Sequence, residues 1–351
     1  MSATVLGIIT IVLVLIILFQ ISKANDSIAV LKDEEKAMES SNSIHAFLFM
    51  AFLVVGLVGS FYSAYWFKEA YLPFPSSIHG EWLRSMFQWT LVVTVPVFVI
   101  THIALFYFAF KYKKDKNRKS YYYSHNNKLE IIWTVIPAVV MILLVYEGIT
   151  SWLKITGPAP TEAIVVEATA QQFMWTIRYS GDDNELGVKN IRLIGDDNSV
   201  GQDWTDAANK DDFIADEIHL PIGKPVVFKL NALDVLHSFY LPHFRVKMDC
   251  VPGIPTQFWF TPTKTTAEMR ATFGPDFNYE LACAELCGSA HYNMRKVVVV
   301  ETQEEYDAWF KEQQPIYKQL GLDKVEGKSN NNMAEEDVPV EEGQEKDISS
   351  L

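Results

Sequence analysis

Four apolar runs within the first 152 residues restrict the fold of this chain more than any other feature of its sequence. Each run is close to the ~20 residues that an α-helix needs to cross the hydrocarbon core of a bilayer. The runs lie at residues 4–22, 45–66, 87–110 and 131–152. Hydrophobic residues make up 49% of the chain although it also contains 43 Asp and Glu, because the acids are concentrated after the apolar part. The sequence therefore predicts a transmembrane region over residues 1–152.

The loop between the third and fourth runs predicts the orientation of the chain. Residues 111–128 contain seven Lys or Arg and one Asp, and short loops rich in Lys and Arg stay on the cytoplasmic side. Residues 67–86 and everything after residue 152 then lie outside. The chain lacks the positively charged start of a secretory signal, so we expect the first run to be retained. We expect a multi-pass protein of the bacterial inner (cytoplasmic) membrane with its C-terminal domain in the periplasm.

Some residues in or next to the apolar runs are polar or disturb a helix. His102 is a candidate functional group because ionisable residues inside a membrane usually have a role, but a neighbouring helix can also satisfy a neutral His. Pro96 lies in the same run. Glu130 opens the fourth run, where a carboxylate stabilises the N-terminus of a helix through the macrodipole. Charge alone therefore favours a capping role for Glu130.

The pattern changes to short alternating or apolar runs after residue 152. Such runs lie at residues 163–167, 225–230, 256–260 and 296–301, and Pro and Gly occur between them. Several short strands in a domain of this size predict a β-sandwich over residues 153–302. Residues 303–351 are rich in Glu, Gln and Asn, which predicts an acidic, largely disordered C-terminal tail.

The negative charge of the chain restricts its partners. The net charge is −13, which argues against nucleic acid and favours cationic partners. Residues 181–217 hold eleven Asp or Glu and three Lys or Arg. This stretch is either a solvated loop or an acidic landing surface for a basic electron donor, where charge would chiefly accelerate association.

A cluster of soft metal ligands lies near the end of the predicted sandwich. Two thiols, an imidazole and a thioether fall within twelve residues, at Cys283, Cys287, His291 and Met294. Sulfur ligands with an imidazole suit copper, and a weak axial Met is a mark of copper electron-transfer sites. A second Cys suggests two copper ions bridged by both sulfurs, and each ion then needs its own His. His237 lies 46 residues before Cys283, and His243 competes with it.

The two cysteines are also compatible with a zinc site, a disulfide or simple burial. Structural zinc favours CxxC pairs and has no use for Met. A disulfide between Cys283 and Cys287 is compatible with an oxidising compartment, but it leaves His291 and Met294 unexplained. Free cysteines are also commonly buried. The spacing favours copper over these alternatives.

Four separate segments follow one another in the order found in one known family. They read LEIIWTVIP at 129–137, DVLHSF at 234–239, KMDCVPG at 247–253 and CAELCGSAHYNM at 283–294. These segments resemble cytochrome c oxidase subunit II, and the resemblance covers about residues 125–302, half of the chain. It implies an all-β cupredoxin-like Greek-key sandwich that holds a dinuclear copper centre (CuA), preceded by a helical hairpin. The first two apolar runs would be an addition to that hairpin.

The resemblance also assigns ligands. The side chains it implies are His237, Cys283, Cys287, His291 and Met294, together with the backbone carbonyl of Glu285. It selects His237 over His243 because the family's ligand lies in an LHS sequence. The Glu285 carboxylate is implied to reach a magnesium ion shared with the catalytic subunit, with Asp249 nearby. Cys250 stands where the family usually has a small residue, so we interpret it as packing.

Further positions take their meaning from the resemblance. Glu130 matches a family Glu at the mouth of a proton-conducting channel, which displaces the capping interpretation. Phe173 replaces the family's first surface Trp, through which electrons arrive, and Trp175 matches the second aromatic; core packing is the alternative for both. Arg178 stands where some relatives have a docking carboxylate. Asp234 resembles a carboxylate that helps to dock cytochrome c.

The function implied is that of the electron-input subunit of a haem–copper terminal oxidase. Such a subunit accepts electrons from a cytochrome c or a c-type haem domain. It passes them to haem in catalytic subunit I, where oxygen is reduced and protons are pumped. The expected partners are subunit I, other oxidase subunits and membrane lipid. Two alternatives are a quinol oxidase subunit II, which lacks the copper-binding cysteines, and a membrane-anchored copper-delivery or sensing protein, which would bind copper exchangeably.

Overall fold

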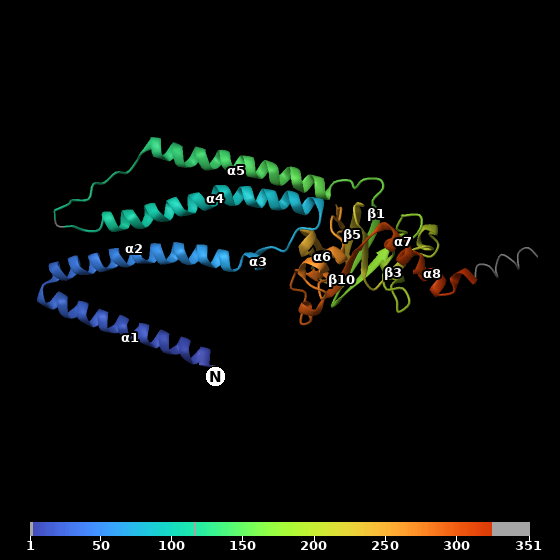
Figure 1. Ribbon diagram of the computed structural model, residues 1–351, viewed down its shortest axis with the longest axis horizontal. Coiled ribbons are helices and arrows are strands. Elements are labelled where there is room, and N and C mark those ends of the chain that lie inside the picture. Colours follow the sequence, from blue (N-terminus) through green and yellow to red (C-terminus); the bar gives the residue numbers. More distant parts are fainter. Residues whose placement is uncertain (1–2, 116, 325–351) are drawn as a thin grey trace, which may run out of the picture. The chain divides into compact units, whose positions relative to one another are not determined.

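The computed structural model of the protein describes residues 3–115 and 117–324, which divide into two compact units. One unit combines the residues up to 72 with 86–145, and the other combines 73–85 with the residues from 146 onward. The first unit is helical, and the second contains two β-sheets (Figure 1). The predicted fold class, membrane-type helices followed by a cupredoxin-like β-sandwich, is confirmed.

Four helices in the described part of the chain are long and apolar enough to cross a membrane. They are α1 (Ala3–Lys32), α2 (Glu34–Trp66), α4 (Ile78–Lys111) and α5 (Asn127–Thr156); the short α3 (Lys68–Tyr71) follows α2. Each is longer than the apolar run that predicted it. An apolar run marks only the part of a helix that suits hydrocarbon, whereas its backbone hydrogen bonds continue into the polar flanks.

Helix α2 packs against α4 through aromatic side chains. Phe106 of α4 lies 5.9 Å from Phe49 and 5.6 Å from Phe52 of α2, measured between ring centroids. His102 is satisfied within its own helix, because its Nδ1 lies 2.7 Å from the carbonyl oxygen of Phe98. The neighbouring helix that the sequence suggested as its partner is therefore not needed.

The ten strands of the second unit form two five-stranded sheets. In spatial order the first sheet is β3 (Phe213–Ala215), β2 (Met174–Tyr179), β1 (Ile164–Gln171), β5 (Val226–Ala232) and β8 (Thr256–Phe260). The second is β4 (Ile218–Pro221), β10 (Arg295–Glu301), β9 (Tyr279–Cys283), β6 (His237–Leu241) and β7 (Val246–Cys250). The pairs β1–β5 and β4–β10 are parallel, and the other pairs are antiparallel. Parallel neighbours require the chain to cross over, as in a Greek key.

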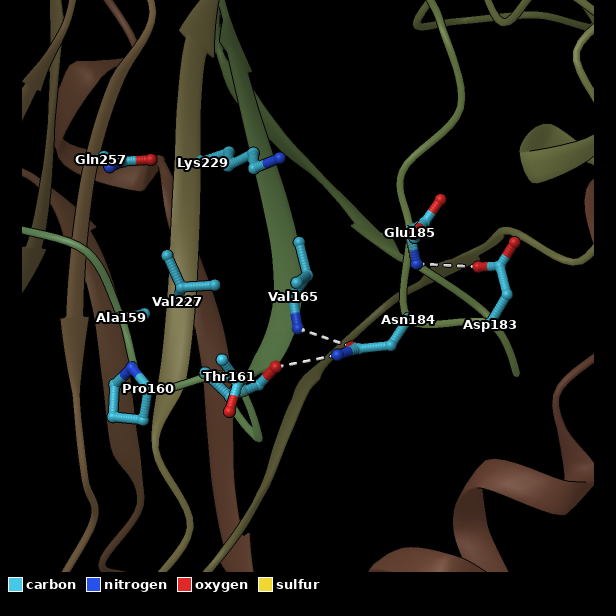
Figure 2. Close-up of a pocket in the computed structure, with 11 residues that line it drawn as sticks. Ala159, Pro160, Thr161, Val165, Asp183, Asn184, Glu185, Val227, Lys229 and Gln257 are labelled. Atoms are coloured by element: carbon cyan, nitrogen blue, oxygen red, sulfur yellow. Dashed lines mark hydrogen bonds between the residues drawn. The ribbon is translucent and has the colours of Figure 1, made fainter.

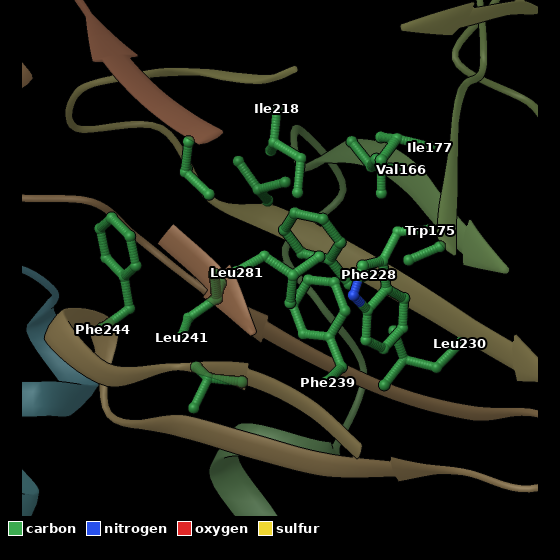
Figure 3. Close-up of a cluster of buried hydrophobic side chains, with 14 of the residues drawn as sticks. Val166, Trp175, Ile177, Ile218, Phe228, Leu230, Phe239, Leu241, Phe244 and Leu281 are labelled. Atoms are coloured by element: carbon green, nitrogen blue, oxygen red, sulfur yellow. The ribbon is translucent and has the colours of Figure 1, made fainter. Parts of the chain in front are cut away.

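Aromatic side chains from both sheets meet in the core of the sandwich. Phe228 of β5 lies 5.1 Å from Phe239 of β6, and Trp175 of β2 lies 5.5 Å from the same ring (Figure 3). These side chains are fully buried. Burying a side chain of this size stabilises the fold by about 1.5–3 kcal/mol. This core supports the loop that connects β9 with β10.

The segment before α4 is hydrogen-bonded to the sandwich. The backbone N–H of Ile78 donates to Thr261 O (3.1 Å), and the N–H of Thr263 donates to Ser76 O (2.9 Å). These bonds explain why residues 73–85 belong to the β unit rather than to the helical unit. They agree with the prediction that this segment lies on the same side of the membrane as the sandwich.

The acids of residues 181–217 largely organise the loop itself. Oδ2 of Asp211 accepts hydrogen bonds from the backbone N–H groups of Asp182 (2.7 Å) and Asp183 (3.0 Å). Asp206 accepts another backbone N–H at 2.8 Å. Carboxylates that bond to local backbone groups in this way replace the hydrogen bonds of regular structure. The loop is thus a folded insertion.

Arg178 lies inside this assembly, because its side chain is only 1% exposed. Its Nη2 lies 2.9 Å from Asp212 Oδ2 and 2.6 Å from Gly187 O, and its Nη1 lies 3.3 Å from Glu167 Oε2. Lys189 binds the other oxygen of Glu167 at 2.5 Å. Arg178 therefore joins the insertion to the sheet and is not exposed to a docking partner.

The predicted tail begins with two helices, which precede the part, from about residue 322, where we expect disorder. In α7 (Gln303–Glu312), Trp309 stacks on His219 of β4 at 4.2 Å, and Phe310 contacts Phe213 of β3 at 5.2 Å. The short α8 (Ile316–Gln319) follows. Aromatic residues on one face of α7 bury enough apolar surface to order it, which an average composition does not reveal. Residues 325–351 of the predicted tail lie outside the described residues.

Candidate metal centre

The loop between β9 and β10 carries four of the predicted ligands. Cys283 ends β9, and Met294 directly precedes β10. The N–H of Cys283 donates to Met294 O at 3.2 Å, which closes the loop at its base. The N–H of Ala284 donates to Ser238 O at 2.9 Å and ties the loop to β6. His237, the first residue of β6, is therefore held beside the loop although it is distant in sequence.

The structure brings the two thiols and the two predicted imidazoles together. The Sγ atoms of Cys283 and Cys287 are 3.9 Å apart. Nδ1 of His237 lies 3.9 Å from Cys283 Sγ, and Nδ1 of His291 lies 3.5 Å from Cys287 Sγ. A disulfide requires about 2.05 Å between sulfurs, and both thiols are free. Each cysteine therefore has one histidine beside it.

Two weaker donors complete the group. Sδ of Met294 lies 3.9 Å from Cys287 Sγ, and the carbonyl oxygen of Glu285 lies 3.2 Å from Cys283 Sγ. The thioether is next to one cysteine and the carbonyl is next to the other. Soft sulfur with imidazole is the donor chemistry of copper, whereas magnesium and calcium require oxygen. The residues present fit a copper centre.

Burial affects the acidity of the thiols. Burial, and to a smaller extent the neighbouring Cys283, raise the pKa of Cys287 to about 11. Both cysteines are less than a tenth exposed. Because thiolates are the metal ligands, a metal must displace protons here, so its binding is coupled to proton release.

Asp234 fixes the orientation of the remote histidine. Its Oδ1 lies 2.9 Å from His237 Nε2, which directs Nδ1 of the same ring toward Cys283. Burial alone would raise the pKa of Asp234, but hydrogen bonds from His237 and from backbone N–H groups lower it. A carboxylate on the outer nitrogen of a metal-binding His is a common device that fixes the tautomer. The carboxylate assigned to docking thus also supports a ligand.

The two predicted electron-transfer aromatics lie in different environments. Trp175 is buried, its ring centroid is 6.3 Å from that of His237, and its Nε1 donates to Met294 O at 3.4 Å. Phe173 is half-buried at the turn between β1 and β2, and it packs against the edge of the core. Trp175 is therefore a core residue that contacts the candidate ligand group, and Phe173 is a partly exposed residue at the edge of the same core.

The remaining predicted side chains are not among the donors of the sulfur cluster, although Cys250 lies opposite His237 in the pairing of β6 with β7. The side chains of Glu285 and Asp249 are exposed. Cys250 is fully buried, and burial raises the pKa of its thiol to about 12. The ring of His243 packs against Phe277 at 5.1 Å. His243 is thus part of the packing around Phe277 and does not join the cluster.

Glu130 is placed as a helix cap in the structure. Its Oε1 accepts a hydrogen bond from the N–H of Asn126 at 3.1 Å, and Asn126 Oδ1 accepts one from Leu129 at 3.2 Å. This reciprocal pair satisfies N–H groups at the start of α5. The capping role that charge alone predicted for Glu130 is present.

Sequence reasoning missed Gln172 and Gly288. Gln172 Nε2 donates to the carbonyl of Cys287 at 2.5 Å, and its backbone N–H donates to Asp234 Oδ2 at 2.7 Å. A Cβ on Gly288 would lie 2.8 Å from the ring of Phe173. The only feature of the sequence that could have indicated a role for these residues is the position of Gln172 directly before Phe173. These contacts join segments that are far apart in the chain.

A groove of about 420 Å³ lies elsewhere, on the outer side of the strands β1, β5 and β8. Its rim includes Lys229, Gln257 and the loop around Asn184, whose side chain bonds to the backbone of Val165 (Figure 2). It shares no residue with the sulfur cluster. The groove is therefore separate from the candidate metal centre.

Two family models match this chain. Residues 164–302 match the periplasmic domain of cytochrome c oxidase subunit II, and residues 64–150 match its transmembrane domain. Helix α1 and most of α2 precede the matched region.

Named relatives agree with these matches. The alternative cytochrome c oxidase subunit 2 of Bradyrhizobium diazoefficiens is 38% identical over 220 residues, covering 62% of this chain and 75% of the relative. Cytochrome c oxidase subunit 2 of Thermostichus vulcanus is 27% identical over 270 residues, covering 70% and 79%. A crystal structure of the periplasmic domain of subunit II from Bradyrhizobium japonicum is 26% identical, with a TM-score of 0.30, and covers 43% of this chain and 94% of that one. With four helices able to cross a membrane and this sandwich, the chain belongs to the cytochrome c oxidase subunit II family.

Proposed function

We propose that this chain is the electron-input subunit of a terminal oxidase and holds a dinuclear copper centre. The observation that carries the proposal is the paired arrangement of two free thiols 3.9 Å apart, each with an imidazole nitrogen within 3.9 Å. A site for a single copper or zinc ion would not require two such cysteine–histidine pairs. When bound, a thiolate-bridged copper pair supplies a site that takes up and releases one electron at a time.

The side chains of the cluster divide into two halves. Cys283 and Cys287 would bridge the pair. His237 and the Glu285 carbonyl would be further ligands of one copper ion, and His291 and Met294 would be further ligands of the other. The ligand loop is held at both ends by strands, which limits its movement when charge changes.

Two aromatic side chains would carry electrons toward the ligands. Phe173 is the half-buried residue at the turn, and Trp175 is buried with its ring 6.3 Å from that of His237. The family position of Phe173 is a surface Trp. A Phe retains the aromatic surface but has no indole N–H for a docking partner.

Two carboxylates have proposed roles at the boundary with the catalytic subunit. The exposed side chain of Glu285 is free to reach a shared magnesium ion while its carbonyl faces Cys283. Glu130 would lie at the mouth of a proton channel, and its hydrogen bond to Asn126 holds the carboxylate at the start of α5. Both roles rest on the family resemblance together with these placements.

The proposed setting is the bacterial inner membrane, with the sandwich in the periplasm. The basic loop at residues 111–128 supports this orientation. The partners would be catalytic subunit I and other oxidase subunits, with a cytochrome c or a c-type haem domain as donor. The electron would pass to haem in subunit I, where oxygen reduction is coupled to proton pumping.

Copper counting on the purified full-length chain tests the proposal. We expect two copper ions per chain and, after partial reduction, an electron paramagnetic resonance signal shared over both ions. Cys283→Ser and Cys287→Ser should each lose the shared signal. Cys250→Ala is the matched control, because Cys250 is a buried thiol outside the cluster, and it should retain two copper ions. One copper per chain with a localised signal would contradict the dinuclear assignment.

A further inference from the structure

Gln172 contacts one candidate ligand, Cys287, and Asp234, the carboxylate that orients another. It lies in the short turn between β1 and β2. Its Nε2 donates to the carbonyl of Cys287, 115 residues away, and its backbone N–H donates to Asp234, 62 residues away. Asp234 in turn holds the outer nitrogen of His237 at 2.9 Å. One residue thus joins the cysteine loop to the carboxylate that orients the remote histidine.

The turn between β1 and β2 also approaches the loop between β9 and β10 closely, at Gly288. This glycine has φ +143°, which L side chains rarely adopt, and a Cβ there would lie 2.8 Å from the Phe173 ring and 2.9 Å from Gln172 Nε2. Gln172 and Phe173 therefore both approach Gly288 closely on one side, while the residue remains exposed on the other. Such a close approach leaves little space for the loop to move toward the turn.

We infer that Gln172 is a positioning residue that fixes Cys287 relative to His237, and this inference rests on the proposed dinuclear copper function. Cys287 lies in a loop stretch between β9 and the 3₁₀ turn at His291–Asn293, with no strand partner of its own. Loops are more mobile than the strands that they connect, and ligand geometry must be held within about 0.5 Å to be effective. The amide of Gln172 supplies a side-chain restraint on the carbonyl of Cys287.

The alternative is that Gln172 is an ordinary exposed polar residue. Its side chain is exposed, so replacement leaves the core intact. An exposed glutamine without a positioning role can be replaced with no effect on copper. This difference makes the inference testable without loss of the fold.

The test compares Gln172→Met with Gln171→Met in the full-length chain loaded with copper. Methionine has nearly the size of glutamine but cannot donate the hydrogen bond, and Gln171 is the neighbouring control. Gln172→Asn is a second variant, because it keeps the amide but is too short to reach Cys287. We expect both Gln172 variants to lose copper to a chelator about tenfold faster than wild type. We also expect altered copper hyperfine splitting in both, whereas Gln171→Met should match wild type.

The outcomes separate this inference from the function on which it rests. Wild-type protein without two copper ions would overturn the proposed function itself. Wild-type protein with two copper ions, but with unchanged copper release and unchanged spectra in both Gln172 variants, would overturn only the positioning role. Thermal unfolding of the copper-free variants must match wild type. A general loss of stability would mean that Gln172 supports the domain and not the site.

Discussion

Replacing Arg178 with Met should destabilise the sandwich strongly, because it leaves a buried carboxylate without its cation. Arg178 and its two carboxylate partners are almost completely buried. Glu167 keeps Lys189 at 2.5 Å in the variant. Asp212 loses both its bond to Arg178 Nε (2.9 Å) and its bond to Nη2 (2.9 Å). The variant therefore leaves Asp212 as a buried carboxyl without its cation, which must either remain charged without compensation or take up a proton.

The size of the effect follows from this count. Removing one partner of a buried ion pair costs about 3–5 kcal/mol. With a urea m-value of about 1–3 kcal/mol/M, the unfolding midpoint should fall by about 1 M or more. The double variant Arg178→Met with Asp212→Leu removes both of these charges, so the losses are then the hydrogen bonds with Gly187 and the ion pair of Arg178 with Glu167, which keeps Lys189. Those bonds are worth about 1–3 kcal/mol, so the double variant should be more stable than the single variant.

The pH dependence gives an independent check. Burial raises the pKa of Asp212 to about 7, although Arg178 opposes this shift. When the pKa of a carboxyl is higher in the folded state than in the unfolded state, the folded protein loses stability as the pH rises from the unfolded-state pKa toward the folded-state pKa. Without Arg178 the folded pKa rises further, so this loss continues above pH 7. The difference in stability between wild type and Arg178→Met should therefore be larger at pH 8.5 than at pH 6.

Urea unfolding of the full-length chain in detergent, followed by near-ultraviolet circular dichroism, measures these differences. Arg192→Met is the control, because Arg192 lies on the exposed side of the insertion. A midpoint for Arg178→Met within 0.3 M of wild type (roughly the scale of an ordinary surface change) would refute the reasoning. So would a double variant no more stable than the single one.

Three further predictions concern the metal site and the packing around it. Asp234→Ala should weaken copper binding about 10- to 100-fold, because His237 loses the acceptor on its Nε2; competition with a copper chelator measures this, and unchanged affinity would exclude a supporting role. His243 has a pKa lowered by burial and by nearby positive charge, so the unfolded state binds its proton first and stability should fall as pH drops below about 6.5. His243→Phe should remove that part of the slope in urea unfolding at pH 5–7, and an identical slope would contradict the assignment. Trp309→Ala should destabilise the sandwich by about 2–3 kcal/mol, because it loses the ring stacked at 4.2 Å on His219; rapid proteolysis of α7 without a change in the urea midpoint would instead mean that the helix only rests on the surface.

Local sequence features predicted the elements whose physics is local. The length of an apolar run is set by bilayer thickness, so the four helices could be identified without knowledge of their neighbours. The spacing of Cys283, Cys287, His291 and Met294 also lies within one short loop. Their proximity follows from chain connectivity once the ends of that loop are fixed. The structure brings the distant His237 to the same place.

The structure differed from the sequence-based prediction where burial determines what a residue does. Composition predicts a largely disordered acidic tail over residues 303–351, but aromatic residues at its start, in α7, pack on β3 and β4. Arg178 stands where some relatives have a docking carboxylate, but an insertion formed by residues further along the chain buries it. The cap at Glu130 could be predicted because it depends only on neighbours within four residues.

The sequence by itself determined the membrane-type helices, the strand-rich domain and the candidate ligand types, because each depends on local pattern and chemistry. Only the tertiary structure decided how those ligands are held. The bonds from Gln172 to Cys287 and to Asp234 span 115 and 62 residues, and the pairing of β6 with β9 brings His237 beside the cysteine loop. Contacts between such distant segments form only when two sheets close on a common core. No periodicity or motif in a single sequence records them.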